Sequence, residues 1–135
     1  MNPRALLQTR GYGSFRYSTL FDLTKNMKQM LIGFGLTAEP MLLVEVDRTS
    51  AISMVTALLW RDEFHGIENM PNDAARKIAI EIIDENSNES ARYYSNRADS
   101  ASSVWNPLTS ATFDSGVIVM NDDGLHFCFW IEEED

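Results

Sequence analysis

His126 and Cys128 are the residues of this chain whose types could most directly support catalysis. They stand two apart in an apolar segment with strand-like alternation, so their side chains are expected on one face. A cysteine and a histidine can act together as nucleophile and general base. Such a pair also needs an orienting group and an oxyanion site, and the surrounding pattern supplies neither. Because the segment is apolar and its neighbourhood acidic, we predict instead that Cys128 is buried and chemically inert.

Other chemical constellations have weaker support. His65 follows a predicted helix, where we expect it to interact with the negative end of the helix dipole. The two histidines and the single cysteine lack zinc-ligand spacing, and Asp122-Asp123 lacks the ordered ligands of an EF-hand loop. Gly33-Phe34-Gly35 begins like a dinucleotide fingerprint but lacks its third glycine. We therefore expect no metal, no cofactor and no catalytic residue, although paired carboxylates for glycoside hydrolysis, defined by distance in space, are left open.

The net charge of −9 over 135 residues is the most unusual bulk property of the chain. Residues 1–38 hold five basic side chains and one acidic, whereas residues 39–135 hold six basic and nineteen acidic. An acidic surface repels phosphate backbones and anionic lipids, so we expect neither nucleic acid nor a membrane as partner. It attracts basic proteins and accelerates their association, although the same charge could serve solubility alone.

Composition and cysteine usage predict the class and compartment of the protein. The hydrophobic content of 44% is ordinary for a globular protein, and the length suits a single domain over residues 1–135. A single cysteine cannot form an intrachain disulfide, and the apolar pieces near the start of the chain are too short for a secretory signal. We therefore expect a cytoplasmic protein.

An acidic β-hairpin is the clearest expected element. Residues 112–135 contain seven acidic side chains and no Lys or Arg. Two apolar runs, 116–120 and 125–131, are separated by Asn121-Asp122-Asp123-Gly124, a sequence typical of a hairpin turn with glycine at a position of positive φ. Both faces of the second run are apolar, which favours a central strand covered on both sides.

Apolar residues at helical spacing predict helices over about residues 20–32, 49–64 and 72–85. Residues 1–17 look irregular, and the Ser- and Asn-rich segment 86–103 looks like a long loop with at most a turn or two of helix.

The fold class that follows is α+β: a small antiparallel or mixed sheet, made of a strand over residues 41–47 and the C-terminal hairpin 115–131, covered by about three helices. The predicted core includes Val117, Val119, Phe127, Phe129, Ile78 and Ile82.

These features favour a binding module that neutralises or docks onto a basic protein, and a nuclease toxin is one such partner. In size and charge the chain is similar to bacterial immunity proteins that inhibit nuclease toxins and to phage-encoded inhibitors of host factors. We expect it to be non-enzymatic, and a monomer or homodimer. The expected partner-binding residues are carboxylates of the hairpin and nearby aromatic side chains, a common type of interface anchor: Asp122, Asp123, Glu132, Glu133, Glu134, Trp105, Tyr93 and Tyr94.

Two alternatives remain. One is an enzyme or small-molecule-binding protein with a site near the Ser/Tyr-rich loop 87–105, where the polar groups to consider are Arg92, Tyr93, Tyr94 and Arg97. The other is a self-associating subunit, in which the basic residues 1–38 of one copy meet the acidic face of another.

Overall fold

The predicted hairpin lies in the middle of the sheet in the computed structural model, which describes residues 14–134. Its strands are β4 (Phe113–Met120) and β5 (Leu125–Glu133), which pair antiparallel. The turn between them ends at Gly124, whose φ of 88° would strain any residue with a side chain. The hairpin prediction is therefore confirmed, and both strands reach about two residues further than expected.

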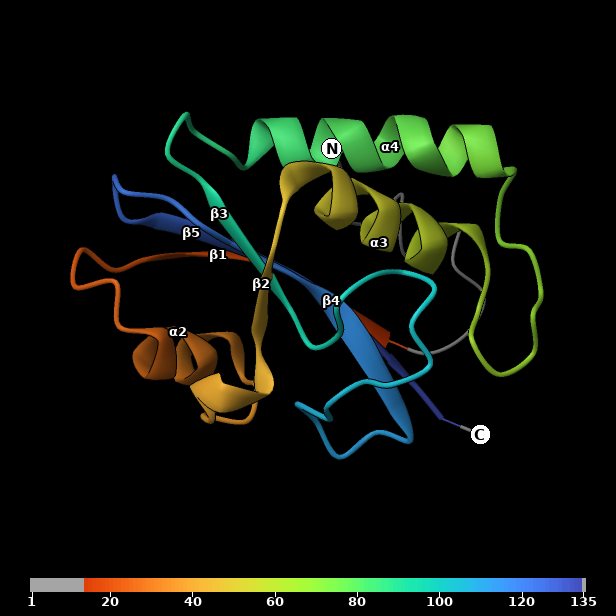
Figure 1. Ribbon diagram of the computed structural model, residues 1–135, viewed down its shortest axis with the longest axis horizontal. Coiled ribbons are helices and arrows are strands. Elements are labelled where there is room, and N and C mark those ends of the chain that lie inside the picture. Colours follow the sequence, from red (N-terminus) through yellow and green to blue (C-terminus); the bar gives the residue numbers. More distant parts are fainter. Residues whose placement is uncertain (1–13, 135) are drawn as a thin grey trace.

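Within residues 14–134 the sheet has five strands, all antiparallel, in the order β1-β5-β4-β3-β2. β1 (Ser14–Phe21) and the short β2 (Val44–Val46) form the two edges, and β3 (Arg92–Ser95) joins β2 to the hairpin. Figure 1 shows α3 (Arg48–Trp60) and α4 (Asn72–Glu85) side by side on one side of the sheet, and α2 (Met27–Phe34) on the other. The predicted α+β class is confirmed as a single small domain, and its sheet is antiparallel rather than mixed.

The helix predictions were accurate for α4 and approximate for α3. α3 begins after Asp47, whose carboxylate caps it by accepting the N–H of Ser50 at 2.7 Å. It ends at Trp60 instead of residue 64, because Arg61 has an extended backbone and forms a β-bridge with Glu68. The expected strand over residues 41–47 is only three residues long, because a short 3-10 helix, η1 (Pro40–Leu42), occupies its start.

The helix predicted over residues 20–32 begins later than expected: β1 extends to Phe21, a turn follows, and only α2, from Met27 on, is helical. The chain leaves β1 through a turn in which the carboxylate of Asp22 accepts the N–H of Thr24 at 2.8 Å and Lys25 has a φ of 55°. Asn26 then caps α2 by accepting the N–H of Gln29. The prediction placed the start of the helix too early, because Leu20 and Leu23 continue the helical spacing of the apolar residues in α2. Residues 1–13 of the segment predicted to be irregular lie outside the described residues.

Strand β3 was also missed, because it lies within a segment that reads as loop from its serines and asparagines. Tyr93 and Tyr94 favour a strand locally. Their strand is stabilised from both sides, by the antiparallel pairing with β2 and with β4.

Each face of the sheet has its own core. The face toward α3 and α4 buries Val117, Val119, Phe127 and Phe129, as predicted. Ile82 is also buried, whereas Ile78 is only partly buried at the edge of this cluster. The face toward α2 buries three residues of the hairpin against three of the helix: Ile118, Cys128, Trp130, Met30, Leu31 and Phe34. β5 is therefore an internal strand covered on both faces, as its sequence predicts.

Candidate protein-binding surface

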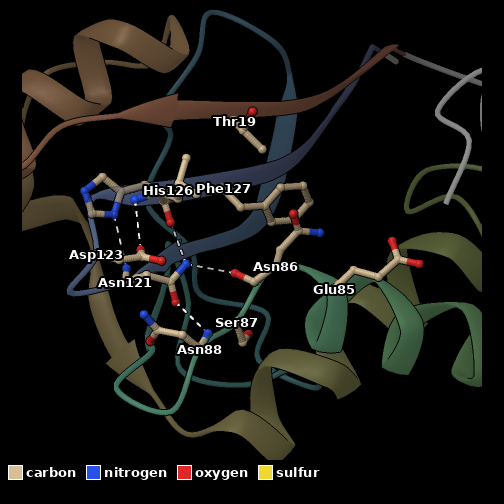
Figure 2. Close-up of a pocket in the computed structure, with 10 residues that line it drawn as sticks. Thr19, Glu85, Asn86, Ser87, Asn88, Asn121, Asp123, His126 and Phe127 are labelled. Carbon is tan, nitrogen blue, oxygen red and sulfur yellow. Dashed lines mark hydrogen bonds between the residues drawn. The ribbon is translucent and has the colours of Figure 1, made fainter.

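A polar cleft of about 370 Å³ opens where the turn of the hairpin meets the end of α4. Its lining residues come from α4, the segment after it, the hairpin turn and β1, and Figure 2 shows Asn121, Asp123, Asn88 and His126 grouped at one side with Glu85 at the other. Most of the residues that line it carry a carboxylate, an amide or a hydroxyl, and Leu125 and Phe127 add apolar surface. The lining residues are Thr19, Glu85, Asn86, Ser87, Asn88, Asn121, Asp123, Leu125, His126 and Phe127.

Asn121 holds the cleft together. Its side-chain N–H group donates to the carbonyls of Asn86 at 3.0 Å and Leu125 at 2.5 Å, and its side-chain oxygen accepts the N–H of Asn88 at 2.9 Å (Figure 2). Asn86 in turn donates to the carbonyl of Ile82 and so satisfies the last turn of α4. Because Asn121 is buried, these bonds fix the hairpin turn against the C-terminal end of α4.

His126 is a structural member of this cleft. Its Nδ1 accepts the N–H of Asn121 at 3.1 Å, and its Nε2 lies 2.8 Å from the carbonyl of Asp22, to which it must donate. This geometry corresponds to a neutral ring with the proton on Nε2, and it uses both nitrogens. Cys128 is fully buried, and burial raises the pKa of its thiol strongly. The prediction that Cys128 is buried is confirmed, and the His126–Cys128 pair offers neither a free base nor a thiolate.

The electrostatics of the cleft favour a cation. The C-terminal end of α4 carries the negative end of the helix dipole, and the last turn contains no basic residue. Glu85 and Asp123 line the cleft, and Glu89 and Asp122 are exposed nearby. Hydrogen bonds with the side chains of Ser90 and Asn88 hold the pKa of Asp122 below its usual value, so it is negative at neutral pH.

An apolar patch adjoins the cleft, consisting of Phe21, Leu23 and Leu125, whose exposed fractions are 62%, 64% and 55%. Phe21 and Leu125 are directly paired between β1 and β5. Leu23 is held beside them, because the N–H of Asp22 donates to the carbonyl of Gly124 at 2.9 Å and the Leu23 side chain lies close to that glycine. Leu125 belongs to both the patch and the cleft wall, so the two features form one continuous surface.

The acidic residues expected to bind a partner do not lie together. Asp122 and Asp123 are exposed in the turn, whereas Glu132, Glu133 and Glu134 lie at the other end of β5. A strand of nine residues spans about 30 Å, so the two groups cannot form one compact site.

Glu132 and Glu133 are not free surface charges. Glu132 forms an ion pair with Arg16 across the β1–β5 pair. Glu133 is only 2% exposed, and its carboxylate accepts the N–H of Glu63 at 2.8 Å. Glu133, which the sequence predicted to bind a partner, is therefore buried instead, because the loop after α3 folds over it. Glu134 is exposed and accepts the hydroxyl of Thr112.

The three predicted aromatic anchors face inward rather than outward. Tyr93 is buried in the core under α3, with its hydroxyl donating to Ser87. Tyr94 packs partly buried on the opposite face. Trp105 lies edge-on against Phe113 with 5.1 Å between ring centroids. None of the three is an exposed anchor. The exposed apolar patch was not predicted, because Phe21 and Leu23 were assigned to the start of a helix and lie instead at the end of β1 and in the turn after it.

The polar groups of the alternative small-molecule site are brought together only in part. Arg92 and Tyr94 line a cavity of about 520 Å³ together with Ser90. Tyr93 points to the opposite face of the sheet, and Arg97 lines a separate cavity. For the self-association alternative, Arg16 is engaged by Glu132 of its own chain.

Among residues 14–134, no group of three or more His, Cys, Asp or Glu side chains is placed to hold a metal ion. In the same part of the chain, no helix has the length and apolar character required to cross a membrane. No family model, no curated protein and no solved structure matches the chain.

Proposed function

We propose that the protein is an acidic, non-catalytic binding module that docks onto a basic protein through the end of the sheet formed by the hairpin turn. The observation that carries this proposal is the contact between the exposed patch of Phe21, Leu23 and Leu125 and the carboxylate-lined cleft. Exposed apolar patches rimmed by polar residues are typical of protein interfaces.

The cleft suits a lysine or arginine side chain of the partner. Glu85 and Asp123 supply negative charge on two sides, and the end of α4 adds its dipole. Asn121 already fixes the backbone of Asn86 and Asn88 in the cleft wall, so a bound cation would meet a preorganised site. The apolar patch beside it would then bury the aliphatic or aromatic neighbours of that cation.

The two features have different kinetic roles. Exposed carboxylates raise the rate of encounter with a basic protein, whereas a well-packed apolar contact mainly slows dissociation. In this proposal the protein acts in the cytoplasm and neutralises its partner by covering a basic functional surface, as required of an inhibitor of a nuclease toxin.

The proposal can be tested by affinity purification from the native host with three forms of the protein. One is wild type, one is the double variant Phe21→Ser/Leu125→Ser, and one is Val104→Ser, a matched control at an apolar side chain that is 77% exposed elsewhere. A basic protein recovered by wild type and the control but lost with the double variant would support the proposal. Truncating a central anchor should weaken binding by about 30-fold or more.

Rapid-mixing kinetics with the recovered partner then separate charge from apolar contact. Glu85→Gln/Asp123→Asn should slow association and flatten its salt dependence, whereas Glu134→Gln, at the far end of β5, should not. Equal recovery by all three purification forms, or equal association rates for both charge variants, would contradict docking at this end.

A further inference from the structure

A second cavity, of about 290 Å³, lies at the opposite end of β5 from the hairpin turn. It is enclosed by the end of α3, the loop after it, Arg97 and Ser100. The bond from the N–H of Glu63 to Glu133 places this loop beside the last residues of β5. The cavity is therefore separate from the cleft proposed to bind a basic partner.

Arg97 is the unusual group of this cavity. Its side chain is 4% exposed, and its Nε–H has no hydrogen-bond partner among residues 14–134. Its Nη1 makes one long contact of 3.5 Å with the carbonyl of Ser102, and its guanidinium carbon lies 5.7 Å from the ring centre of Phe113. Burial lowers the pKa of Arg97, although Glu63 and Asp99 oppose the shift. Burying a guanidinium with so few hydrogen bonds destabilises the fold unless a ligand supplies the missing acceptors and a negative charge.

The carboxylates near the cavity do not pair with this guanidinium. Asp62 is buried but occupied, because it accepts the N–H of Ile67 and both the N–H and the ring Nδ1 of His65, all within 2.9 Å. Burial raises the pKa of Asp62, but these hydrogen bonds outweigh it and hold the pKa below its usual value. His65 therefore bonds Asp62 within this loop. The sequence predicted that it directly follows the helix, but α3 already ends at Trp60. The ion pairs found within residues 14–134 do not include Arg97.

We propose that this cavity binds a small organic carboxylate, held in a two-point contact by the Nε–H and an Nη–H of Arg97. Two parallel N–H groups of arginine match the two oxygens of a carboxylate. The negative charges of Asp62 and Glu63 on the same walls disfavour a dianion such as phosphate, whereas a monoanion matches the unpaired charge of Arg97.

The other residues that line the cavity indicate the chemistry of the part of the ligand attached to the carboxylate. Trp60 and Leu58 contribute apolar surface to the cavity. Arg61 lies 3.6 Å above the ring of Trp60, where it adds a second positive charge at the exposed side. An aromatic or branched aliphatic carboxylate would bury its apolar part against Trp60 while its oxygens reach Arg97. The carboxylate could belong to a free metabolite or to the C-terminus of a peptide, and the experiment separates these sources.

The test follows the Arg97 Nε–H resonance of isotope-labelled wild-type protein by NMR. Sodium benzoate should produce a saturable shift of this resonance, whereas sodium chloride at equal ionic strength and the neutral benzyl alcohol should not. A peptide that ends in a phenylalanine carboxylate and the same peptide with an amide terminus are compared with benzoate. A stronger response to the carboxylate peptide supports a peptide terminus, and a stronger response to benzoate supports a free small carboxylate.

Variants provide the second measurement. Arg97→Lys keeps the charge but removes the paired donors, so benzoate affinity measured by calorimetry should fall by about tenfold or more. Arg76→Lys, an exposed arginine on α4, is the matched control and should bind as wild type. Arg61→Gln should weaken benzoate by about two- to fivefold, so the proposal remains testable if Arg97→Lys does not fold.

The proposal is wrong if the Nε–H resonance of wild type does not respond saturably to benzoate or to the carboxylate peptide. It is also wrong if inorganic phosphate is the preferred ligand, or if folded Arg97→Lys binds benzoate as tightly as wild type. None of these results bears on the basic partner, because the two sites share no residue.

Discussion

Asp114 offers the sharpest test of how this fold is held together. It is fully buried at the start of β4, and its carboxylate accepts the indole N–H of Trp130 at 3.0 Å. It also accepts the backbone N–H groups of Leu108 and Thr109 and the hydroxyl of Thr109. One carboxylate thus anchors both the loop before β4 and the largest side chain of the core under α2. Asn has almost the same shape but replaces one acceptor with a donor.

The cost of Asp114→Asn follows from this geometry. The least damaging orientation points the new NH₂ group at Thr109, whose hydroxyl can rotate to accept it, while the backbone N–H of Thr109 loses its partner. An unsatisfied buried donor costs about 1–3 kcal/mol, and the remaining bonds lose the strength that a charged acceptor gives. The lower desolvation cost of a neutral amide offsets part of this. We expect a net loss of about 2–4 kcal/mol in the free energy of unfolding.

Urea unfolding followed by tryptophan fluorescence would measure this loss. With a urea m-value of about 1–3 kcal/mol/M, the midpoint should fall by about 1–3 M. Asp99→Asn is the matched control, because Asp99 is exposed and the amide oxygen can still accept the N–H of Ala101, so its effect should stay within about 0.5 kcal/mol. An Asp114→Asn midpoint equal to that of the control would refute the reasoning that this carboxylate organises its surroundings.

Four further experiments have definite expected outcomes. Gly116→Ala should destabilise the fold by about 3 kcal/mol or more in the same urea assay, because an added Cβ would lie 2.0 Å from the carbonyl oxygen of Phe129; a wild-type midpoint would show that β4 and β5 pair differently. Phe129→Ala should cost about 3–5 kcal/mol because the ring is buried in the core under α3 and α4, and an unchanged midpoint would contradict that placement. Cys128 should react with a thiol reagent at pH 7 only after denaturant is added, because burial raises its thiol pKa; rapid labelling of native protein would contradict its burial. Asp62→Asn should lower the free energy of unfolding most above pH 3.8, the ordinary carboxyl pKa, because the pKa of Asp62 is depressed in the folded protein. The stabilisation by the ionised carboxylate is lost as the pH falls through the depressed folded pKa. A difference in stability between wild type and variant that grows on acidification would contradict this prediction.

The parts of the fold that the sequence predicted are those with a strong local pattern. α4 has an apolar stripe with helical period, and the hairpin has two apolar runs around a glycine-terminated turn. β1 and β3 have weaker local patterns, and each becomes a strand through pairing with residues far along the chain, as between Phe21 and Leu125. Local periodicity cannot contain that information, because the pairing partner of β1 is more than a hundred residues away and those of β3, in β2 and β4, are also distant in the sequence.

The dependence on distant residues also explains why the exposure of the carboxylates was predicted wrongly. A run of four acidic residues at the end of the chain reads as a solvated tail, but Glu133 is buried because the loop after α3 donates an N–H to it. Asp114 looks like any acid of the hairpin, and its burial depends on donors from three separate segments. Whether a carboxylate is a free charge or a structural acceptor is decided by which backbone N–H groups reach it, and these come from elsewhere in the chain.

The acidic residues of the hairpin have different roles at the two ends of β5. At the far end of β5 the carboxylates are largely engaged, with Glu132 on Arg16 and Glu133 on the loop after α3. At the turn end, Asp122 and Asp123 are exposed beside the end of α4, and the exposed apolar patch lies there as well. A solubilising role for the charge would not explain why Phe21, Leu23 and Leu125 are exposed, since exposed apolar side chains lower solubility. Their coincidence is the physical reason to expect a partner at this end of the molecule, since the same surface can attract a basic protein at long range and retain it by apolar burial.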